Sequence, residues 1–284
     1  MPAGSFKAVK KGIKRRLKML RQAFARTFRS FTPDDLLERL RQLGIVPGDV
    51  VLVHSSYDAF EGFSGKPTDV IAILQRAVGA EGTLLMPTMA FTGTAVEYVS
   101  RTPVFDVART PSRMGLLSEL FRRSPGVVRS VHPTHPVAIW GRDAEGLAAD
   151  HHRAGTPCGA GTPFARLLER QGKILFLGAD IDSLTFYHTI EEMLETRLPA
   201  SPFTQQVYQL KSKLPDGTSV VTQTRLFEPS VSRRRNLGKL APELRRQGAW
   251  HEARVGRLKL TLLGTSDVLA AVAAMADRGA YCYD

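Results

Sequence analysis

The segment GDVVLVHSS, residues 48–56, decides the fold class. It begins with the turn pair Gly48-Asp49, continues through the apolar residues 50–53, and ends in His54-Ser55-Ser56. A short apolar run bounded in this way predicts a buried strand. In open α/β sheets ligands bind at the carboxyl ends of strands, so the polar triplet marks a candidate site. A strand-end turn in which the serines bond the local backbone is the alternative interpretation.

Helix and strand patterns alternate on both sides of this segment. Upstream, Thr32-Pro33-Asp34-Asp35 predicts a capped helix start and Gly44 predicts its end. Downstream, the predicted helices lie at about residues 68–78, 112–123, 163–170 and 183–195, and the predicted strands lie at 83–86, 137–140 and 174–177. This alternation predicts a layered α/β/α sandwich around a largely parallel central sheet.

The pattern changes after Pro199. Two predicted strands, residues 205–211 and 219–225, flank the turn sequence Pro215-Asp216-Gly217. We interpret them as a small antiparallel lobe, inserted at about residues 200–230 into a single domain of residues 32–284. A helix at 237–246, a strand at 258–263 and a last helix capped by Thr265-Ser266-Asp267 complete the predicted elements.

Residues 1–31 have a pattern of their own. Apolar side chains recur there at steps of three and four, at Phe6, Val9, Ile13, Leu17, Leu20, Phe24, Phe28 and Phe31. Lys and Arg fill the other faces, so the segment predicts a basic amphipathic helix. Two roles stay open for it. In the first role the apolar stripe docks on the body of the protein or on another subunit, as in a homodimer. In the second role residues 5–31 lie on an anionic membrane surface.

The basic charge is confined to this segment. The net charge is +12, and residues 1–30 hold ten Lys/Arg and no Asp/Glu, which leaves +2 for the other 254 residues. A nucleic-acid-binding module would carry positive charge across its body, so we expect no nucleic-acid partner. The two cysteines, Cys158 and Cys282, favour a reducing cytosol over a disulfide framework. Without an apolar membrane span or secretory h-region, the sequence predicts a cytoplasmic protein, with the inner face of the membrane as the open alternative.

A cluster of chemically active side chains recurs at helical spacing in the predicted helix 183–195. His188, Glu191, Glu192 and Glu195 fall at i, i+3, i+4 and i+7 and therefore share one face. A carboxylate one turn from an imidazole fixes its tautomer and raises its basicity, and an acidic face attracts a cationic substrate. Spacing alone leaves open a solvated helix face on which the histidine is incidental.

A second polar group is the loop at residues 129–136, RSVHPTHP. Arg129 could meet a phosphate there, and His132 could bond a ligand carbonyl. Together with His151-His152, the histidines of this loop also suggest a metal-binding site. We expect none, because the loop lacks a helical histidine pair and no carboxylate spacing accompanies it.

Five stretches, taken in order, resemble the aminoglycoside 3-N-acetyltransferase family over roughly residues 33–280. They are GDVVLVHSSYDAF, GTLLMPTMAFTG, FDVARTPSRMGLLSELFRRSPGVVRSVHPTHPVAIWG, GAGTPFARLLERQGKILFLGA and LTFYHTIEEM. The resemblance implies an α/β sandwich distinct from the usual small N-acetyltransferase fold. It also implies acetyl-CoA as the acyl donor and an amine of a sugar-like small molecule as the acceptor, with no metal.

The resemblance assigns roles to particular residues. It places the catalytic base at His188 and its partner at Glu191, and we expect Asp182, Glu192 and Glu195 to bind the cationic acceptor. It places the CoA-binding elements at Ser55, Ser56, Thr88, Arg113 and the loop around His132. Two departures concern the ligands: residues 154–163 lack the acid found in many antibiotic-modifying members, and Pro136 replaces a serine.

These departures leave the acceptor open. One candidate is an aminoglycoside-like antibiotic. Another is an amino sugar of surface-polysaccharide biosynthesis, for which a basic helix at the membrane would make sense. A hypothesis of a different class is a basic non-enzymatic module that binds nucleic acid or lipid, and the near-neutral body argues against it.

Overall fold

The computed structural model describes residues 30–102 and 104–284. The basic helix predicted for residues 1–31, with its membrane contact at residues 5–31, lies outside the described residues except at its end. There the prediction was wrong for Phe31. This residue forms a parallel β-bridge with Phe63 and is 2% exposed, because its ring packs into the core 5.3 Å from the ring of Phe63.

Within the described residues, the central sheet has seven strands in the order β4-β5-β2-β1-β6-β10-β9. Their bounds are β1 (Val50–Ser55), β2 (Thr83–Pro87), β4 (Val128–Arg129), β5 (Val137–Gly141), β6 (Lys173–Leu177), β9 (His251–Val255) and β10 (Leu258–Gly264). The strand predicted at residues 50–53 is β1, and it pairs in parallel with β2 and β6 at the centre. The outer pairs β2–β5, β5–β4, β6–β10 and β10–β9 are antiparallel, so the sheet is mixed around a parallel centre.

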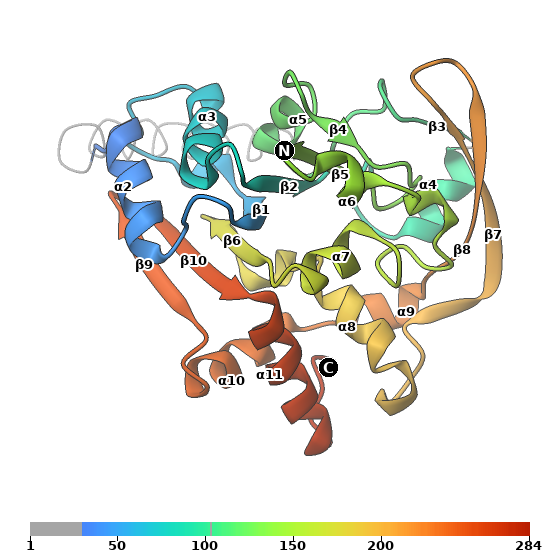
Figure 1. Cartoon of the computed structure of the whole chain (residues 1–284). Helices are drawn as coiled ribbons and strands as arrows, with labels where there is room; N and C mark the ends of the chain where they lie inside the picture. Colours follow the sequence, from blue (N-terminus) through green and yellow to red (C-terminus); the bar gives the residue numbers. More distant parts are fainter. Residues whose placement is uncertain (1–29, 103) are drawn as a thin grey trace, which may run out of the picture.

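Helices cover both faces of this sheet, which confirms the predicted α/β sandwich (Figure 1). Val51 and Val53 of β1 face a core with α2 (Pro33–Leu43), α3 (Pro67–Val78) and α5 (Leu116–Phe121). Leu52, between them, faces the other core, because side chains of a strand alternate between its faces. The helices of that second layer are α6 (Ala144–Ala148), α7 (Pro163–Glu169), α8 (Tyr187–Met193), α10 (Leu240–Arg246) and α11 (Thr265–Asp277).

Two of the predicted helices are shorter than expected. The helix predicted at residues 112–123 is α5, which starts only after Gly115. The helix predicted at 183–195 is α8 between two 3₁₀ turns, η3 (Ile181–Ser183) and η4 (Glu195–Arg197). His188 and Glu191 stay on the α-helical turn, whereas Glu195 lies beyond it.

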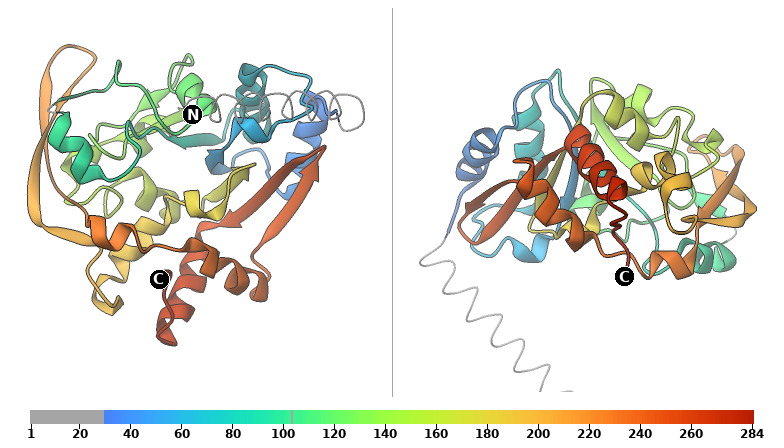
Figure 2. Two further views of the ribbon diagram at one scale, coloured as in Figure 1. Left: turned by 180° about the vertical axis from the view of Figure 1, so that it is seen from behind. Right: turned by 90° about the horizontal axis from the view of Figure 1, so that it is seen from below.

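The predicted antiparallel lobe is a small second sheet that stands to one side of the body (Figures 1 and 2). Its hairpin consists of β7 (Phe203–Lys213) and β8 (Ser219–Phe227). The strand β3 (Val104–Asp106), which the sequence did not predict, pairs in parallel with β7. The α-helices α4 (Ala95–Arg101) and α9 (Pro229–Ser232) were also not predicted. Strand β8 ends at Phe227 and so returns the chain to the carboxyl end of the central sheet.

The two predicted helix caps differ in outcome. At α2 the hydroxyl of Thr32 accepts the N–H of Asp35 at 3.2 Å, and Gly44 ends the helix with φ of 112°, as predicted. At α11 the predicted cap was wrong. Thr265 is the first helical residue and is fully buried, and Gly264 occupies the cap position without a side-chain bond.

Gly178 follows β6 in a position that only glycine fits. Its φ is +66°, and a Cβ there would lie 2.2 Å from the Cβ of Ala59. We expect Gly178→Ala to lower the free energy of unfolding by about 2–4 kcal/mol, because left-handed strain adds to overpacking. Urea unfolding measures the change. The matched control is Gly155→Ala, where a Cβ meets nothing within 4 Å. Equal stability of the two variants would contradict the argument.

Candidate active site

A cleft of about 480 Å³ opens where the parallel strands end. The chain places its polar residues there because the carboxyl ends of β1, β2 and β6 meet at one edge of the sheet. Three histidines line the cleft: His54 from β1, His135 from the loop before β5, and His188 from α8. Other lining residues come from these loops and from the hairpin, among them Ser55, Met89, Met114, Asp182, Phe227 and Arg235.

The structure brings His188 and Glu191 together as the helical spacing predicted. Nδ1 of His188 lies 2.7 Å from Oε2 of Glu191. An ionised carboxylate only accepts hydrogen bonds, so Nδ1 carries the proton and Nε2 keeps its lone pair. The side chain of His188 is 17% exposed and lines the cleft, whereas that of Glu191 is fully buried. The basic nitrogen is therefore available to a ligand in the cleft.

The cation Arg235 keeps Glu191 ionised. Nε of Arg235 donates to Oε1 of Glu191 at 2.7 Å, and the hydroxyl of Tyr283 donates to the same oxygen. Burial alone would raise the pKa of Glu191, but the hydrogen bonds and charges of His188 and Arg235 hold it below the usual value. Burial and then the charge of Arg235 lower the pKa of His188, against the opposing effect of Glu191. At neutral pH the site thus contains a neutral imidazole beside a buried ion pair.

Aromatic rings fix the orientation of this imidazole. The ring of Phe227 lies 4.2 Å from that of His188, and the ring of His135 meets it edge-on at 6.2 Å. The guanidinium of Arg235 lies over the ring of Phe227, 5.1 Å from its centroid. The sequence did not single out Phe227, Arg235 or Tyr283 as site residues. They lie 39 to 95 residues beyond His188 along the chain and have no periodic relation to it.

Of the residues predicted to bind CoA, Ser55 lines the cleft. The N–H of Ser56 donates to the carbonyl of Leu177 at 3.0 Å at the edge of the sheet, so this N–H is not available to a ligand. Thr88 and His132 are both fully buried. The hydroxyl of Thr88 bonds Pro136 and Arg129, and Nδ1 of His132 accepts the N–H groups of the turn that follows it. These two residues support the cleft wall without lining it.

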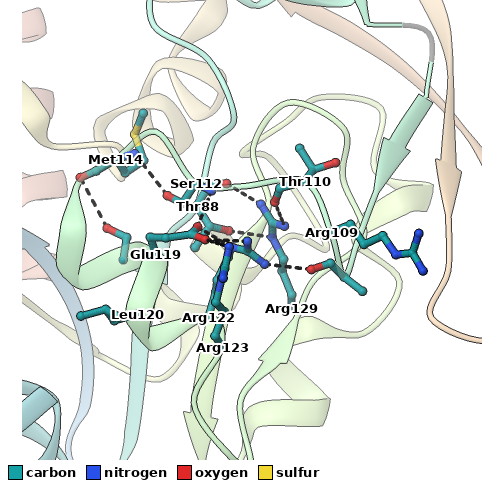
Figure 3. A network of polar contacts seen from close by, with 12 residues as sticks. Thr88, Arg109, Thr110, Ser112, Met114, Glu119, Leu120, Arg122, Arg123 and Arg129 are labelled. Atoms are coloured by element: carbon teal, nitrogen blue, oxygen red, sulfur yellow. Dashed lines mark hydrogen bonds and ion pairs between the residues drawn. The ribbon is translucent and has the colours of Figure 1, made fainter.

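A network of polar contacts holds the loop on which Ser112 and Met114, the two neighbours of Arg113 in the chain, lie (Figure 3). Arg129 donates to the carbonyls of Val107 and Thr110 at 3.0 and 2.7 Å, and it also bonds Thr88. Glu119 accepts the N–H of Ser112 at 2.7 Å and pairs with Arg122. Arg129 is therefore occupied internally, so the sequence-based idea that it meets a phosphate is wrong. The side chain of Arg113 is exposed and has no partner among the described residues.

The predicted acidic contacts divide into two groups. Asp182 is exposed, lines the cleft and has no partner among the described residues. Glu195 is paired with Arg225 at 3.1 Å and also accepts a hydrogen bond from Ser201. Glu192 accepts the hydroxyl of Thr156. The structure therefore brings Asp182 to the cleft and does not bring Glu192 or Glu195 there.

Comparison with known proteins decides the family. The model of the family described as aminoglycoside 3-N-acetyltransferase matches residues 52–277. The chain belongs to this family. Aminoglycoside N(3)-acetyltransferase III of Serratia marcescens is 32% identical over 203 residues, which cover 67% of this chain and 72% of that protein. Aminoglycoside N(3)-acetyltransferase VII of Streptomyces paromomycinus is 34% identical over 56% of this chain, and the match spans 60% of that protein.

Solved structures agree with this assignment to the aminoglycoside 3-N-acetyltransferase family. Aminoglycoside acetyltransferase AAC(3)-Xa has a TM-score of 0.75 at 27% identity, and the match covers 94% of this chain and 98% of that one. A mutant of AAC(3)-IVa in complex with gentamicin has a TM-score of 0.72 at 27% identity, over 88% and 89% of the two chains. The predicted family, fold class and acyltransferase activity are therefore confirmed. A solved structure of AAC-IIIb, a binary complex with CoASH, has the same fold, with a TM-score of 0.75 at 24% identity over 89% of this chain and 99% of that one.

Among residues 30–102 and 104–284, no group of His, Cys, Asp and Glu side chains is arranged to hold a metal ion. In the same part of the chain, no helix has the length and apolar character that crossing a bilayer requires. The predicted homodimer, cytoplasmic location and membrane contact of residues 5–31 stay predictions.

Proposed function

We propose that this enzyme transfers the acetyl group of acetyl-CoA directly to an amine of an aminoglycoside or a related amino sugar, with His188 as the general base. The observation that carries the proposal is the neutral imidazole at the cleft, with Nδ1 held by the ionised Glu191. A base in this state accepts a proton through Nε2 without first losing one, which general-base catalysis at neutral pH requires.

The chemistry of the transfer follows from this arrangement. The acceptor amine attacks the thioester carbonyl carbon, and Nε2 of His188 takes the proton that the nitrogen loses. The tetrahedral adduct then breaks its C–S bond, and the leaving thiolate takes the proton back from the imidazolium. Glu191 stabilises that imidazolium while it exists, because the two groups lie 2.7 Å apart.

The donor side of the cleft fits the arm of a CoA thioester. Its wall is mainly apolar there, with Met89, Phe91 and Met114. The exposed guanidinium of Arg113 would meet a phosphate, since the N–H of Arg113 bonds the carbonyl of Met89 at 2.8 Å and so ties the loop to this wall. The hydroxyl of Ser55 has no partner among the described residues and would donate to the oxyanion, whereas the N–H of Ser56 is engaged.

The acceptor side has room for more than one sugar ring. A second cavity of about 260 Å³ shares Ala179 and Asp182 with the main cleft and also includes Asp180 and Trp250. The carboxylates of Asp180 and Asp182 have no partner among the described residues and would bind ammonium groups of the acceptor. Glu192 and Glu195 line neither cavity and already accept hydrogen bonds from other side chains, so direct binding of the acceptor rests on the two aspartates.

One observation favours the second acceptor, an amino sugar of surface-polysaccharide biosynthesis. Among the described lining residues of the main cleft, the one carboxylate is that of Asp182, and the cation Arg235 belongs to the same lining. A polycationic antibiotic needs several carboxylates to offset its charge on binding, whereas an amino sugar with a single ammonium needs only one. The charge of the cleft therefore suits a weakly charged amine.

The test is acetyl-CoA turnover, read by release of the free thiol, against a panel of acceptors. The panel contains polycationic aminoglycosides and amino sugars with one amine, and the His188→Ala variant provides the blank. We expect thiol release above the blank with at least one acceptor class. Faster turnover of the aminoglycosides supports the first acceptor, and faster turnover of the singly charged sugars supports the second. Release equal to the blank with every acceptor would overturn the proposed function.

A further inference from the structure

We infer that Tyr283 is a positioning residue for the His188–Glu191 pair, delivered by a C-terminal strap that we define as residues 282–284. The inference rests on the proposed function, because it assigns a role in the same proton transfer. The strap lies beyond residues 52–277, over which the family model matches. Tyr283 therefore adds to the pair from a segment outside that match.

The strap is docked on the segment that follows α9 by backbone pairing. Tyr283 forms an antiparallel bridge with Arg235, and the N–H of Asn236 donates to the carbonyl of Cys282 at 2.9 Å. The N–H of Asp284 donates to the carbonyl of Arg234 at 2.8 Å. Both views of Figure 2 place this end of the chain beside α9. The strap is thus a short strand-like addition with a defined register.

Side chains reinforce this docking at the outer end of the strap. The carboxylate of Asp284 accepts both hydrogen bonds of the Asn236 amide at 3.0 Å and pairs with Lys239 at 2.8 Å. These contacts are at the surface, whereas Tyr283 is 9% exposed and points inward. The outer end therefore holds the register that places the Tyr283 hydroxyl on Glu191.

The side chains of Arg235 and Tyr283, the two residues of the backbone bridge, meet at one carboxylate oxygen of Glu191. Arg235 and Tyr283 both donate to Oε1 of Glu191, which leaves Oε2 for Nδ1 of His188. Two donors on one oxygen fix the rotation of the carboxylate, and this rotation sets the direction of the bond to the imidazole. Burial and the charge of Glu191 raise the pKa of Tyr283, so its hydroxyl stays protonated and acts as a donor.

The phenol also tunes the basicity of His188. A hydrogen bond to Oε1 withdraws negative charge from the carboxylate and so weakens its pull on the imidazole proton. The other titratable groups that face Glu191 and His188 from neighbouring elements are Arg235, His135, Tyr187, Cys158 and Cys282. The Tyr283→Phe substitution leaves all five side chains in place, and Tyr187 is the one among them that interacts with the Tyr283 hydroxyl. A change in the titration of His188 that occurs in Tyr283→Phe and not in Tyr281→Phe therefore reports on the Tyr283 hydroxyl.

The test is Tyr283→Phe in the full chain, which keeps the buried ring and removes one donor. We expect kcat to fall about tenfold with the KM for acetyl-CoA unchanged, since a hydrogen bond to a charged group is lost. We expect the acid limb of the kcat/KM profile to move to higher pH. NMR titration of ¹⁵N-labelled histidine, with His188 assigned from its Ala variant, should show the same direction without substrate. The matched control is Tyr281→Phe, since Tyr281 is near the strap and has no side-chain partner among the described residues.

Two results separate the inference from the proposed function. If Tyr283→Phe lowers the melting temperature but leaves kcat and the His188 titration as in Tyr281→Phe, the phenol is only structural and the inference is overturned. If the wild type shows no turnover with any acceptor, the proposed function fails. The NMR titration still measures the coupling of Tyr283 to His188 in that case, and an unchanged titration would overturn the inference independently.

Discussion

Replacement of His188 with alanine is expected to lower kcat about 10³-fold, a loss typical of removing a positioned general base. The structure offers no substitute. Glu191 is fully buried behind the imidazole, and His135, the neighbouring cleft histidine, has a pKa well below the usual value because it is buried and faces His188. Neither group is able to take a proton from an amine in the cleft at His188's position. Stopped-time assays of thiol release with saturating acetyl-CoA measure the loss.

The expected loss must be separated from a change in folding. His188 packs on Phe227 at 4.2 Å, so alanine leaves a gap there. His188→Gln fills more of the gap and still lacks a base, and we expect the same loss of kcat from it with a melting temperature close to the wild type. His251→Ala is the matched control, because His251 is exposed on the edge strand β9. Turnover near the wild-type rate in His188→Gln would rule out the mechanism.

The local parts of this site were predictable from the sequence because their cause is local. The strand β1 is encoded by a continuous apolar run with Gly48-Asp49 before it, and helical spacing alone places Glu191 one turn after His188. Such patterns act within about one turn or one strand, where backbone geometry fixes which side chains are neighbours. These two elements supply the cleft edge and the base.

The remaining parts of the site depend on contacts that cannot be predicted from the spacing of residues in the sequence. The acidic face predicted at His188 is divided because Arg225, from the distant strand β8, pairs with Glu195. The predicted start of α5 is lost because the N–H of Ser112 bonds the Glu119 side chain and Gly115 adopts φ of 115°. Arg235 reaches Glu191 across 44 residues of sequence. The pairings of Arg225 and Arg235 are set by partners 30 and 44 residues along the chain, whereas the start of α5 is set by a side chain seven residues away that helical spacing does not record.

Acid is expected to unfold this protein at a mild pH, because four histidines are buried and neutral. Burial lowers the pKa of His54 to about 3 and that of His151 to about 4. The pKa values of His132 and His135 lie well below the usual value for the same reason. The rings of His132 and His151 also stack at 4.7 Å, so two protons there would repel each other. The folded state therefore resists protonation that the unfolded chain accepts.

The sign and size follow from proton linkage. Unfolded histidines titrate near pH 6.5, so below that pH the unfolded state binds more protons and the stability falls as the pH falls. Each neutral histidine costs about 1.4 kcal/mol per pH unit, or about 2 kcal/mol at pH 5. Four of them amount to about 8 kcal/mol, which is comparable to the whole stability of a typical domain. The pKa of Glu191 is lowered in the folded state, so its contribution to stability is lost only when the pH falls below the usual pKa of a carboxyl. Between pH 6.5 and 5 the histidines therefore determine the change in stability.

Urea unfolding between pH 7.5 and 5 measures the effect as a fall in the free energy of unfolding, and proton uptake on unfolding at pH 5.5 counts the histidines directly. His54→Phe should reduce that uptake by about one proton, because His54 stacks on Phe176 at 5.2 Å and a phenyl ring keeps this packing. His251→Ala should leave the uptake per buried histidine unchanged. A stability that stays flat from pH 7.5 to 5 would show that these histidines accept protons in the folded state. In that case the cleft could not keep His188 neutral by burial either.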